Sequence, residues 1–337
     1  MLLRWLVALA VLAAPAVAVT IDGQDSPHIA VWAGKLRTAL TLIEQGDYPR
    51  AAVILEDALA RAERSQAPER TVAMTLGLLG SAYEELGRYR DAEFSDRRAM
   101  LLAKNLDGED QLGLCRPLEN LARLNAQMAN YQRAEALYRQ SLKLRRKLLG
   151  AGHPSLSLIL NNLGEVYRRQ GRNSDAERLL RRSLNESVEN LGPNHPEVAA
   201  CLNNLGALYG DEGFVIEASE SLERAVAIWG EVLGDSHPTY AQGLANLATL
   251  YTEAGRGEEA EALYLRSLEI TERILGPDHR KAGLILSNYA VLLRNMDRKK
   301  DARRIERRAR EILIRHSREN FLHLTVDISE LQSESGE

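Results

Sequence analysis

"LGPNHPEVAACLNNLGALY", residues 191–209, holds a Gly-Pro turn, a histidine and then two adjacent asparagines inside an apolar helical pattern. The same pattern returns along the chain at an interval of 42 residues. Aligned on its leading "LG", it begins four segments without an insertion, at residues 149, 191, 233 and 275. A fixed period of this length indicates that the chain repeats one structural unit.

One alanine marks the same position in seven such units. Successive copies lie 42 residues apart, except that the first precedes the second by 41: Ala51, Ala92, Ala134, Ala176, Ala218, Ala260 and Ala302. Within a unit the apolar residues follow helical spacing twice, with a break between the two runs. Each unit is therefore an antiparallel helix pair, which cannot bury both of its apolar faces alone. The sequence predicts an all-α solenoid of about seven stacked helix hairpins.

The order of residues in "LNNLGALY", followed by a glycine, "EA" and "AV", resembles a tetratricopeptide repeat. The long period and the "LGPxHP" connector resemble the kinesin-light-chain type of that repeat. The resemblance covers residues 28–316 and weakens in the first two units, which have shorter connectors and no "HP". It implies a right-handed superhelix whose first helices line a concave groove that binds peptides or partner proteins.

Four histidines follow the same period, and the first three precede a proline: His153, His195, His237 and His279. A zinc site needs its ligand atoms about 2 Å from one ion, whereas equivalent positions in stacked units lie about 10 Å apart. Gly192 can end one helix with a positive φ, and Pro196 suits the first turn of the next helix. We therefore interpret the histidines as helix-entrance residues, with contact to a partner as the alternative. Arg280 replaces the proline in the last unit, as in a relaxed terminal repeat.

A column of asparagines occupies one mid-helix position of five consecutive units: Asn120, Asn162, Asn204, Asn246 and Asn288. Asparagine is a middling helix former, so this column needs a tertiary reason. Either each amide satisfies a backbone group of an adjacent helix or loop, or the column lines the groove. An amide offers both the donor and the acceptor that a peptide main chain needs. In the family that the chain resembles, first-helix asparagines contact bound peptide, which implies the same role here.

Other first-helix residues join the candidate peptide-binding groove. Asn161 and Asn203 each precede a member of the column, and Arg123 and Glu165 each follow one by three residues. Arg169 lies further along the helix of Glu165. Their mixed charges specify no ligand of a single charge.

The first residues, "MLLRWLVALAVLAAPAVAVT", have the layout of a cleavable secretory signal, with cleavage after Ala18 and a linker over residues 19–27. We expect a secreted or periplasmic protein. An uncleaved anchor in the inner membrane, facing the periplasm, is the alternative. Cys115 and Cys201 lie two units apart, roughly 20 Å by helix stacking, whereas a disulfide needs Cα atoms within about 7 Å. We expect both to be unpaired core residues.

The end of the chain is basic and then irregular. Residues 294–318 hold eleven Lys or Arg against four Asp or Glu. This charge suits a solvated cap on the last repeat, or contact with an anionic membrane surface or an acidic partner. Residues 317–337 form a tail whose apolar residues alternate as in a strand. Packing on the last helix, occupation of the groove and recognition by a partner are the possible uses of the tail.

The formal net charge of −4 gives no reason to expect nucleic acid as a partner. The sequence contains no HExxH, GxxxxGK[ST], GxSxG or CxxC motif. We therefore predict a non-catalytic exported scaffold or adaptor that binds a peptide or protein partner in its groove, without a metal ion or cofactor. The alternative is a structural or regulatory subunit of a membrane-associated envelope or secretion complex, docked through the basic C-terminal end. The partner and the oligomeric state remain open.

Overall fold

The computed structural model describes residues 27–320, without the side chains at 27–30, 109 and 318–320. The predicted signal segment and the tail beyond residue 320 lie outside the described residues. Within these limits the chain forms fourteen α-helices and one short 3-10 helix. No helix in this part is long and apolar enough to cross a membrane.

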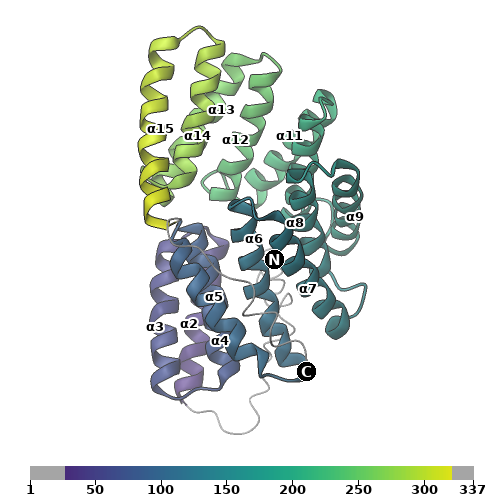
Figure 1. Ribbon diagram of the computed structural model, residues 1–337, viewed down its shortest axis with the longest axis vertical. Coiled ribbons are helices and arrows are strands. Elements are labelled where there is room, and N and C mark those ends of the chain that lie inside the picture. The colour runs from purple at the N-terminus through teal and green to yellow at the C-terminus, as the bar shows by residue number, and fades with distance from the viewer. Residues whose placement is uncertain (1–26, 321–337) are drawn as a thin grey trace.

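The α-helices pair in chain order into seven antiparallel hairpins, which we call units 1 to 7 (Figure 1). The 3-10 helix η1 (Gly108–Leu114) connects units 2 and 3. The units are α2 (Pro27–Glu44) with α3 (Tyr48–Arg64), α4 (Glu69–Glu85) with α5 (Tyr89–Lys104), α6 (Cys115–Gln127) with α7 (Tyr131–Leu149), α8 (Ser155–Arg169) with α9 (Asn173–Leu191), α10 (Pro196–Asp211) with α11 (Val215–Leu233), α12 (Pro238–Glu253) with α13 (Gly257–Leu275), and α14 (Arg280–Asn295) with α15 (Lys299–Asn320). The predicted all-α repeat solenoid is confirmed, and its last helix ends four residues beyond residue 316.

The periodic alanine is buried in every unit. All seven copies are at most 2% exposed. Ala218 and Ala260, for example, belong to one core cluster with Leu222, Tyr251 and Tyr264. A side chain this small lets neighbouring helices approach closely, and extra methylene groups there would cost about 1 to 3 kcal/mol. The repetition of alanine therefore sets the spacing of the array.

The "LGPNHP" connector ends one helix and caps the next. Gly192 follows α9 with φ +88°, a backbone conformation that favours glycine. His195 then precedes α10, and its Nδ1 accepts a hydrogen bond from the Glu197 amide at 3.2 Å. The three other histidines accept the same bond at 3.1 to 3.2 Å. The predicted helix-entrance role is confirmed, and among the described residues no His, Cys, Asp and Glu cluster is arranged to hold a metal ion.

The two cysteines are buried and unpaired, as predicted. Cys201 Sγ lies 3.1 Å from the hydroxyl of Ser183 on the preceding helix. Burial raises the pKa of each thiol to about 11. Both residues therefore serve as small core side chains.

A second periodic contact joins neighbouring units and was not predicted from sequence. The Tyr167 hydroxyl donates to Glu135 of the preceding unit at 3.1 Å, and the Arg172 guanidinium lies 3.9 Å from the centre of the tyrosine ring. Two other boundaries repeat this arrangement, with Tyr83, Glu56 and Arg88 and with Tyr251, Glu223 and Arg256. Each such cluster ties the second helix of one unit to the turn of the next.

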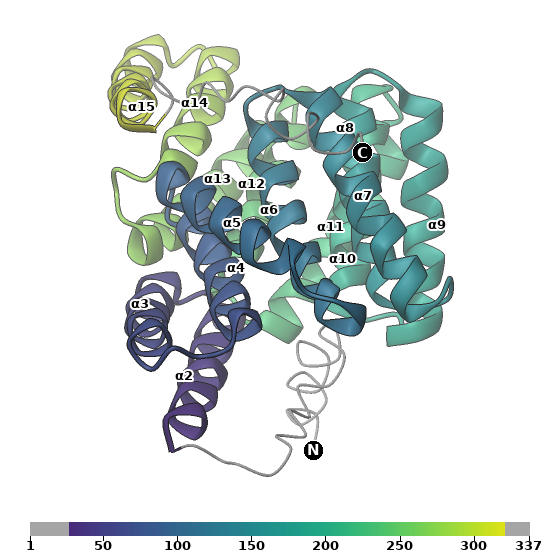
Figure 2. The same cartoon turned by 60° about the horizontal axis from the view of Figure 1, so that its bottom comes forward.

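The array curls until its last two units lie against its first two (Figures 1 and 2). We call this contact the seam. Lys281 of α14 forms an ion pair with Glu85 of α4 at 2.7 Å, across 196 residues of sequence. The rings of Tyr89 in α5 and His316 in α15 meet edge to face at 5.1 Å. The superhelix therefore closes on itself.

Burial at the seam changes the chemistry of two histidines. It lowers the pKa of His279 and of His316 to about 4, so both rings are neutral near pH 7. Burial opposes ionisation of Glu85, but the Lys281 ammonium outweighs it and holds the Glu85 pKa below its usual value. The Lys281–Glu85 pair is therefore a charged contact of the seam, beside two neutral histidine rings.

Two equivalent glycines offer a matched test of the seam. Gly46 and Gly171 occupy the turns of units 1 and 4 with φ +74° and +73°, but an added Cβ at Gly46 would lie 2.4 Å from Pro238, whereas at Gly171 it meets nothing within 4 Å. Both Gly→Ala changes carry the strain of positive φ. We expect Gly46→Ala to lower the free energy of unfolding by about 1 kcal/mol or more beyond Gly171→Ala.

Chemical denaturation measures this difference, and small-angle X-ray scattering should show a larger radius of gyration for the Gly46→Ala protein. Equal destabilisation by the two changes, with unchanged scattering, would contradict the seam.

Candidate functional site

The inner face of the array encloses a cavity of about 730 Å³, which we call the groove. Its walls come mainly from the first helices of six units, α4, α6, α8, α10, α12 and α14. Because equivalent residues of successive units face it, each column of the repeat becomes a row of side chains along the groove. The first helices of the units therefore line the groove, as predicted.

Asparagines of three units form one continuous chain of hydrogen bonds, the amide ladder. Asn204 Nδ2 donates to Asn161 at 3.1 Å, Asn203 Nδ2 to Asn204 at 3.2 Å, and Asn246 Nδ2 to Asn203 at 2.8 Å. Gln242 extends the chain by donating to Asn246 at 3.1 Å. Each side-chain nitrogen thus points to the oxygen of the amide before it, from α12 through α10 to α8.

The ladder leaves hydrogen-bonding capacity unused. A primary amide has two N–H groups and two acceptor lone pairs. Asn203, Asn204 and Asn246 each spend one N–H and one lone pair within the ladder. All three line the groove and are partly exposed. Each can therefore donate one further hydrogen bond and accept another without breaking the ladder.

The ladder ends where the paired asparagines end. Glu119 replaces Asn161 one unit earlier and is held by Ser141 and Arg145, while Ala245 replaces Asn203 one unit later. Asn162 consequently lines the groove without a hydrogen-bond partner among the described residues. Asn288 is exposed and donates instead to Thr249 at 3.3 Å.

The predicted groove role does not hold for Asn120. Its side chain is 2% exposed, and its Nδ2 donates to Gly77 O at 3.0 Å and to Asp96 at 2.8 Å. Its Oδ1 accepts from Ser81 and Arg123, each at 3.0 Å. Burial raises the pKa of Asp96 well above its usual value, against the effect of the Asn120 hydrogen bond. Asn120 therefore serves as the hydrogen-bond donor of the buried Asp96, and its role is structural.

Asn161 is likewise 3% exposed and reaches the groove only through the ladder.

The predicted charged residues lie at the groove and neutralise one another. Arg123 pairs with Glu84 at 2.6 Å, and Glu165 pairs with Arg169 at 2.6 Å. Arg168 bonds both Glu165 and Asp211. Burial opposes the charge of Glu165, but the hydrogen bonds from its two arginines hold its pKa below the usual value.

The groove residues that were not predicted include Glu85 and Tyr89 of unit 2 and Lys281 of unit 7. They face the same cavity only because the seam closes, so no local pattern marks them. Another, Arg280, was visible in the sequence as the loss of a proline that units 4 to 6 share.

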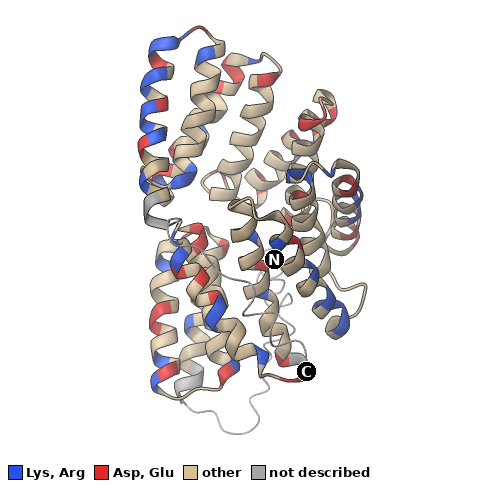
Figure 3. Ribbon diagram, viewed as in Figure 1, with Lys and Arg blue, Asp and Glu red and all other residues tan. Residues whose placement is uncertain are grey.

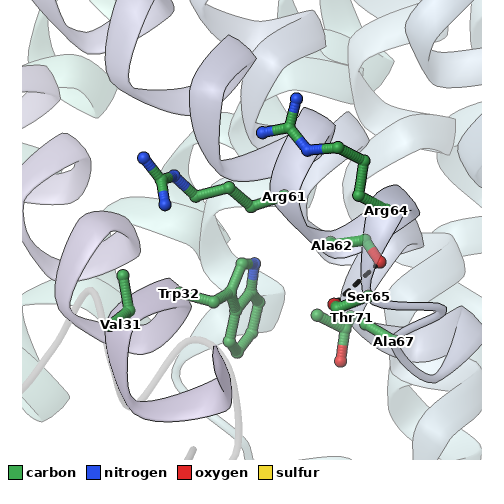
Figure 4. A pocket seen from close by; sticks show the side chains of 8 residues that line it. All are labelled: Val31, Trp32, Arg61, Ala62, Arg64, Ser65, Ala67 and Thr71. Carbon is green, nitrogen blue, oxygen red and sulfur yellow. Dashed lines mark hydrogen bonds between the residues drawn. The ribbon is translucent and has the colours of Figure 1, made fainter. Parts of the chain in front are cut away.

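A second cavity, of about 410 Å³, lies at the outer end of unit 1 (Figure 4). Its wall includes Trp32, whose indole N–H donates to Thr75 at 2.9 Å, and Arg61, which pairs with Asp57. These polar groups already serve the fold, so the groove is the stronger candidate site.

Family models now give the class of protein. A tetratricopeptide-repeat model matches residues 35–105, 113–185, 155–213 and 242–315, and a second tetratricopeptide-repeat model matches residues 198–239. Together they span most of the chain, which belongs to the tetratricopeptide-repeat family. A search of curated proteins found no match.

Solved structures similar to the chain include BtubC (BKLC) from P. vanneervenii, which is 25% identical over 68% of this chain and 92% of that one, with a TM-score of 0.51. Nearly identical TPR-like repeats of a putative kinesin light chain from Podosopora anserina are 27% identical over 60% and 96%, with a TM-score of 0.46. A Rap protein complexed with Competence and Sporulation Factor is 13% identical over 86% and 77%, with a TM-score of 0.64.

The prediction of a tetratricopeptide-repeat protein is confirmed by the family models. The Rap likeness shows the fold alone. A solenoid of this family indicates a protein or peptide partner.

The two kinds of asparagine should separate in a stability measurement. Asn120→Ala leaves the buried Asp96 without its donor, so we expect a loss of about 2 to 3 kcal/mol in the free energy of unfolding. Asn203→Ala exposes its former partners to a wet groove, so we expect a loss under about 1 kcal/mol. Urea unfolding of the two variants beside the parent protein makes the comparison. A loss at Asn203 as large as that at Asn120 would mean that the ladder serves the fold.

Proposed function

We propose that the chain is an exported, non-catalytic scaffold or adaptor that binds a linear peptide segment of its partner in the groove. The amide ladder is the observation that carries this proposal. Its free N–H groups and lone pairs match the alternating donors and acceptors of an extended main chain, whatever the side chains. A Rap protein of the same fold forms a complex with a Competence and Sporulation Factor, so the fold can hold a ligand.

The charges of the groove support a binding role over catalysis. Arg123, Arg168 and Arg169 are engaged by Glu84, Glu165 and Asp211. The arginines hold the pKa of Glu165 below its usual value, so this carboxylate is a poor proton donor or acceptor near pH 7. The pairs also fix the side chains, which lowers the entropy lost on binding.

The exported location rests on the sequence of residues 1–18. We place the mature protein in the periplasm or outside the cell, with an uncleaved anchor in the inner membrane as the alternative. The mass and N-terminal sequence of protein recovered from cell fractions distinguish these locations, because cleavage after Ala18 would leave Val19 as the first residue.

A second candidate function, docking on a membrane-associated envelope or secretion complex, draws on the outer face of α15. Lys and Arg follow this helix along its length (Figure 3). Lys300, Arg303, Arg307 and Arg310 recur at spacings of three and four residues, so they form one stripe. All four are exposed, and none has an ion-pair partner among the described residues.

Replacement of ladder residues tests the first proposal. We expect the Asn203→Ala, Asn246→Ala double variant to lose peptide or partner binding at least about tenfold, because several main-chain hydrogen bonds would be lost. Isothermal titration with peptides selected on the parent protein measures the loss. Arg303→Gln, on the outer face, should leave it unchanged. Unaltered binding by a folded double variant would exclude the ladder as the contact surface.

Changes in the stripe test the second candidate. We expect Arg303→Gln, Arg307→Gln and Arg310→Gln together to abolish sedimentation with vesicles containing anionic phospholipid at low salt, since each basic residue contributes about 1 kcal/mol near such a surface. The ladder double variant should still sediment. If the parent protein does not sediment with anionic vesicles, the stripe is only the solvated surface of the last repeat.

A further inference from the structure

The turn of unit 5 departs from the repeat. Phe214 stands at a position that is arginine in units 2, 4, 6 and 7, namely Arg88, Arg172, Arg256 and Arg298. In units 2, 4 and 6 this arginine covers a tyrosine ring. Phe214 cannot form that cation contact, although the equivalent ring of Tyr209 and its acidic partner Glu177 are both present. The exchange therefore removes a stabilising contact of the repeat.

The exchange creates an apolar surface, which we call the unit 5 patch. Phe214, Val215 and Ile216 follow one another at the turn and are 52%, 44% and 72% exposed. No other turn among the described residues carries adjacent large apolar side chains with this exposure. Exposed apolar side chains that gather in one place mark an interaction surface.

The seam shows what such a turn contacts in this fold. In unit 2 the positions equivalent to Phe214 and Ile216 are Arg88 and Arg90. Both arginines line one cavity with residues 275–279, the connector that leads into unit 7. The tyrosine between them meets the ring of the unit 7 histidine, as described above. All three positions of the patch therefore face another unit where the seam covers them.

The same surface is open in the middle of the array. In units 1 and 2 the turn glycine lies against the connector of unit 6 or of unit 7. At the turn glycines of units 4 to 6 an added Cβ would meet nothing within 4 Å among the described residues: Gly171, Gly213 and Gly255. The unit 5 patch therefore lies on a free stretch of the surface that the seam uses.

The seam pairs units that lie five apart, unit 1 with unit 6 and unit 2 with unit 7. By the same offset, the turn of unit 5 would meet the connector of a tenth unit. Seven units are described, so a second copy stacked on unit 7 would supply the tenth as its own unit 3. The connector of unit 3 also departs from the repeat, because it holds η1 with the partly buried Leu112 and Leu114 in place of the "HP" motif. The two departures fall opposite each other in this register.

We propose that copies of this protein stack head to tail, with the unit 5 patch of one copy on the unit 3 connector of the next. The contact continues the seam from one molecule to another. Because its two surfaces differ, each added copy leaves a patch free for a further copy. None of the three patch residues lines the groove, so the stacking does not depend on the proposed peptide binding.

Acidic residues flank both surfaces of the contact. Glu212 and Glu217 are exposed beside the patch, and Asp107 and Asp110 are exposed in the connector. These like charges oppose stacking, whereas burial of the apolar side chains favours it. Salt screens the repulsion, so stacking should strengthen as the ionic strength rises. Association between surfaces of opposite charge would weaken instead.

Analytical ultracentrifugation of the full mature protein over a concentration series tests the stacking. The variant Phe214→Arg, Ile216→Ser gives unit 5 the residues that unit 4 has at these positions. Its arginine can cover Tyr209, so the variant should resist urea at least as well as the parent protein. Phe94→Arg is the matched control, because Phe94 is 68% exposed within α5, away from the turns.

We expect the parent protein and the Phe94→Arg control to associate with rising concentration, and more strongly at higher salt. The double variant should associate at least about tenfold more weakly, because the apolar contact is lost. A parent protein that sediments as a monomer at every concentration would overturn the proposal. Equal association of the double variant would overturn it as well.

Cross-linking of single cysteines tests the register. Ile216→Cys and Asp107→Cys are treated with a bis-maleimide reagent, each alone and as a mixture. Cys115 and Cys201 are buried, with the pKa of each thiol raised to about 11, so they should not react. We expect a cross-linked dimer from the mixture only, and none when Phe214→Arg is added to Ile216→Cys. A dimer from Ile216→Cys alone would show patch on patch and overturn the head-to-tail contact.

Discussion

Each hairpin of this chain is apolar on two faces and can cover neither by itself. Its neighbours must do so, and the alanine buried at the same place in all seven units sets how closely they approach. Because that distance is constant, residues at equivalent positions of successive units form rows along the inner surface. A row of asparagines, a row of helix-capping histidines and the tyrosine-glutamate-arginine clusters are all products of one repeated contact.

The period was sufficient to predict the hairpins and their number, because it reports contacts between neighbours. The capping histidines followed for the same reason, since His195 and Pro196 act on a helix that they adjoin. The site was only half predictable. The asparagine column can be recognised in the sequence. Asn120, however, is buried and bonded to Asp96, an acid 24 residues away, and no repeat pattern predicts that contact. The seam depends on small rotations between successive units that accumulate over five steps, and the amino-acid sequence does not reveal these rotations.

The groove combines a ladder of neutral amides with charged side chains that pair with one another. Its ladder presents amides already held in place by each other, so little ordering is needed before a ligand binds. Under the proposed function, such a surface would recognise the extended form of a peptide main chain more than its side chains. A closed superhelix adds a restriction of size, since a cavity of about 730 Å³ admits a strand but not a folded domain. Under the proposed function, any preference among peptides would come from the side chains of the groove that depart from the repeat.

The seam also alters how the molecule should unfold. In an open solenoid each unit touches only its neighbours, so end units can fray one at a time. Here the loss of unit 7 would expose unit 2 as well, because Lys281 and Glu85 join them across 196 residues. Closing so long a segment carries an entropic cost that must be met after the intervening hairpins have formed. The array should therefore assemble unit by unit, close last, and then resist fraying at its C-terminal end as a single cooperative ring.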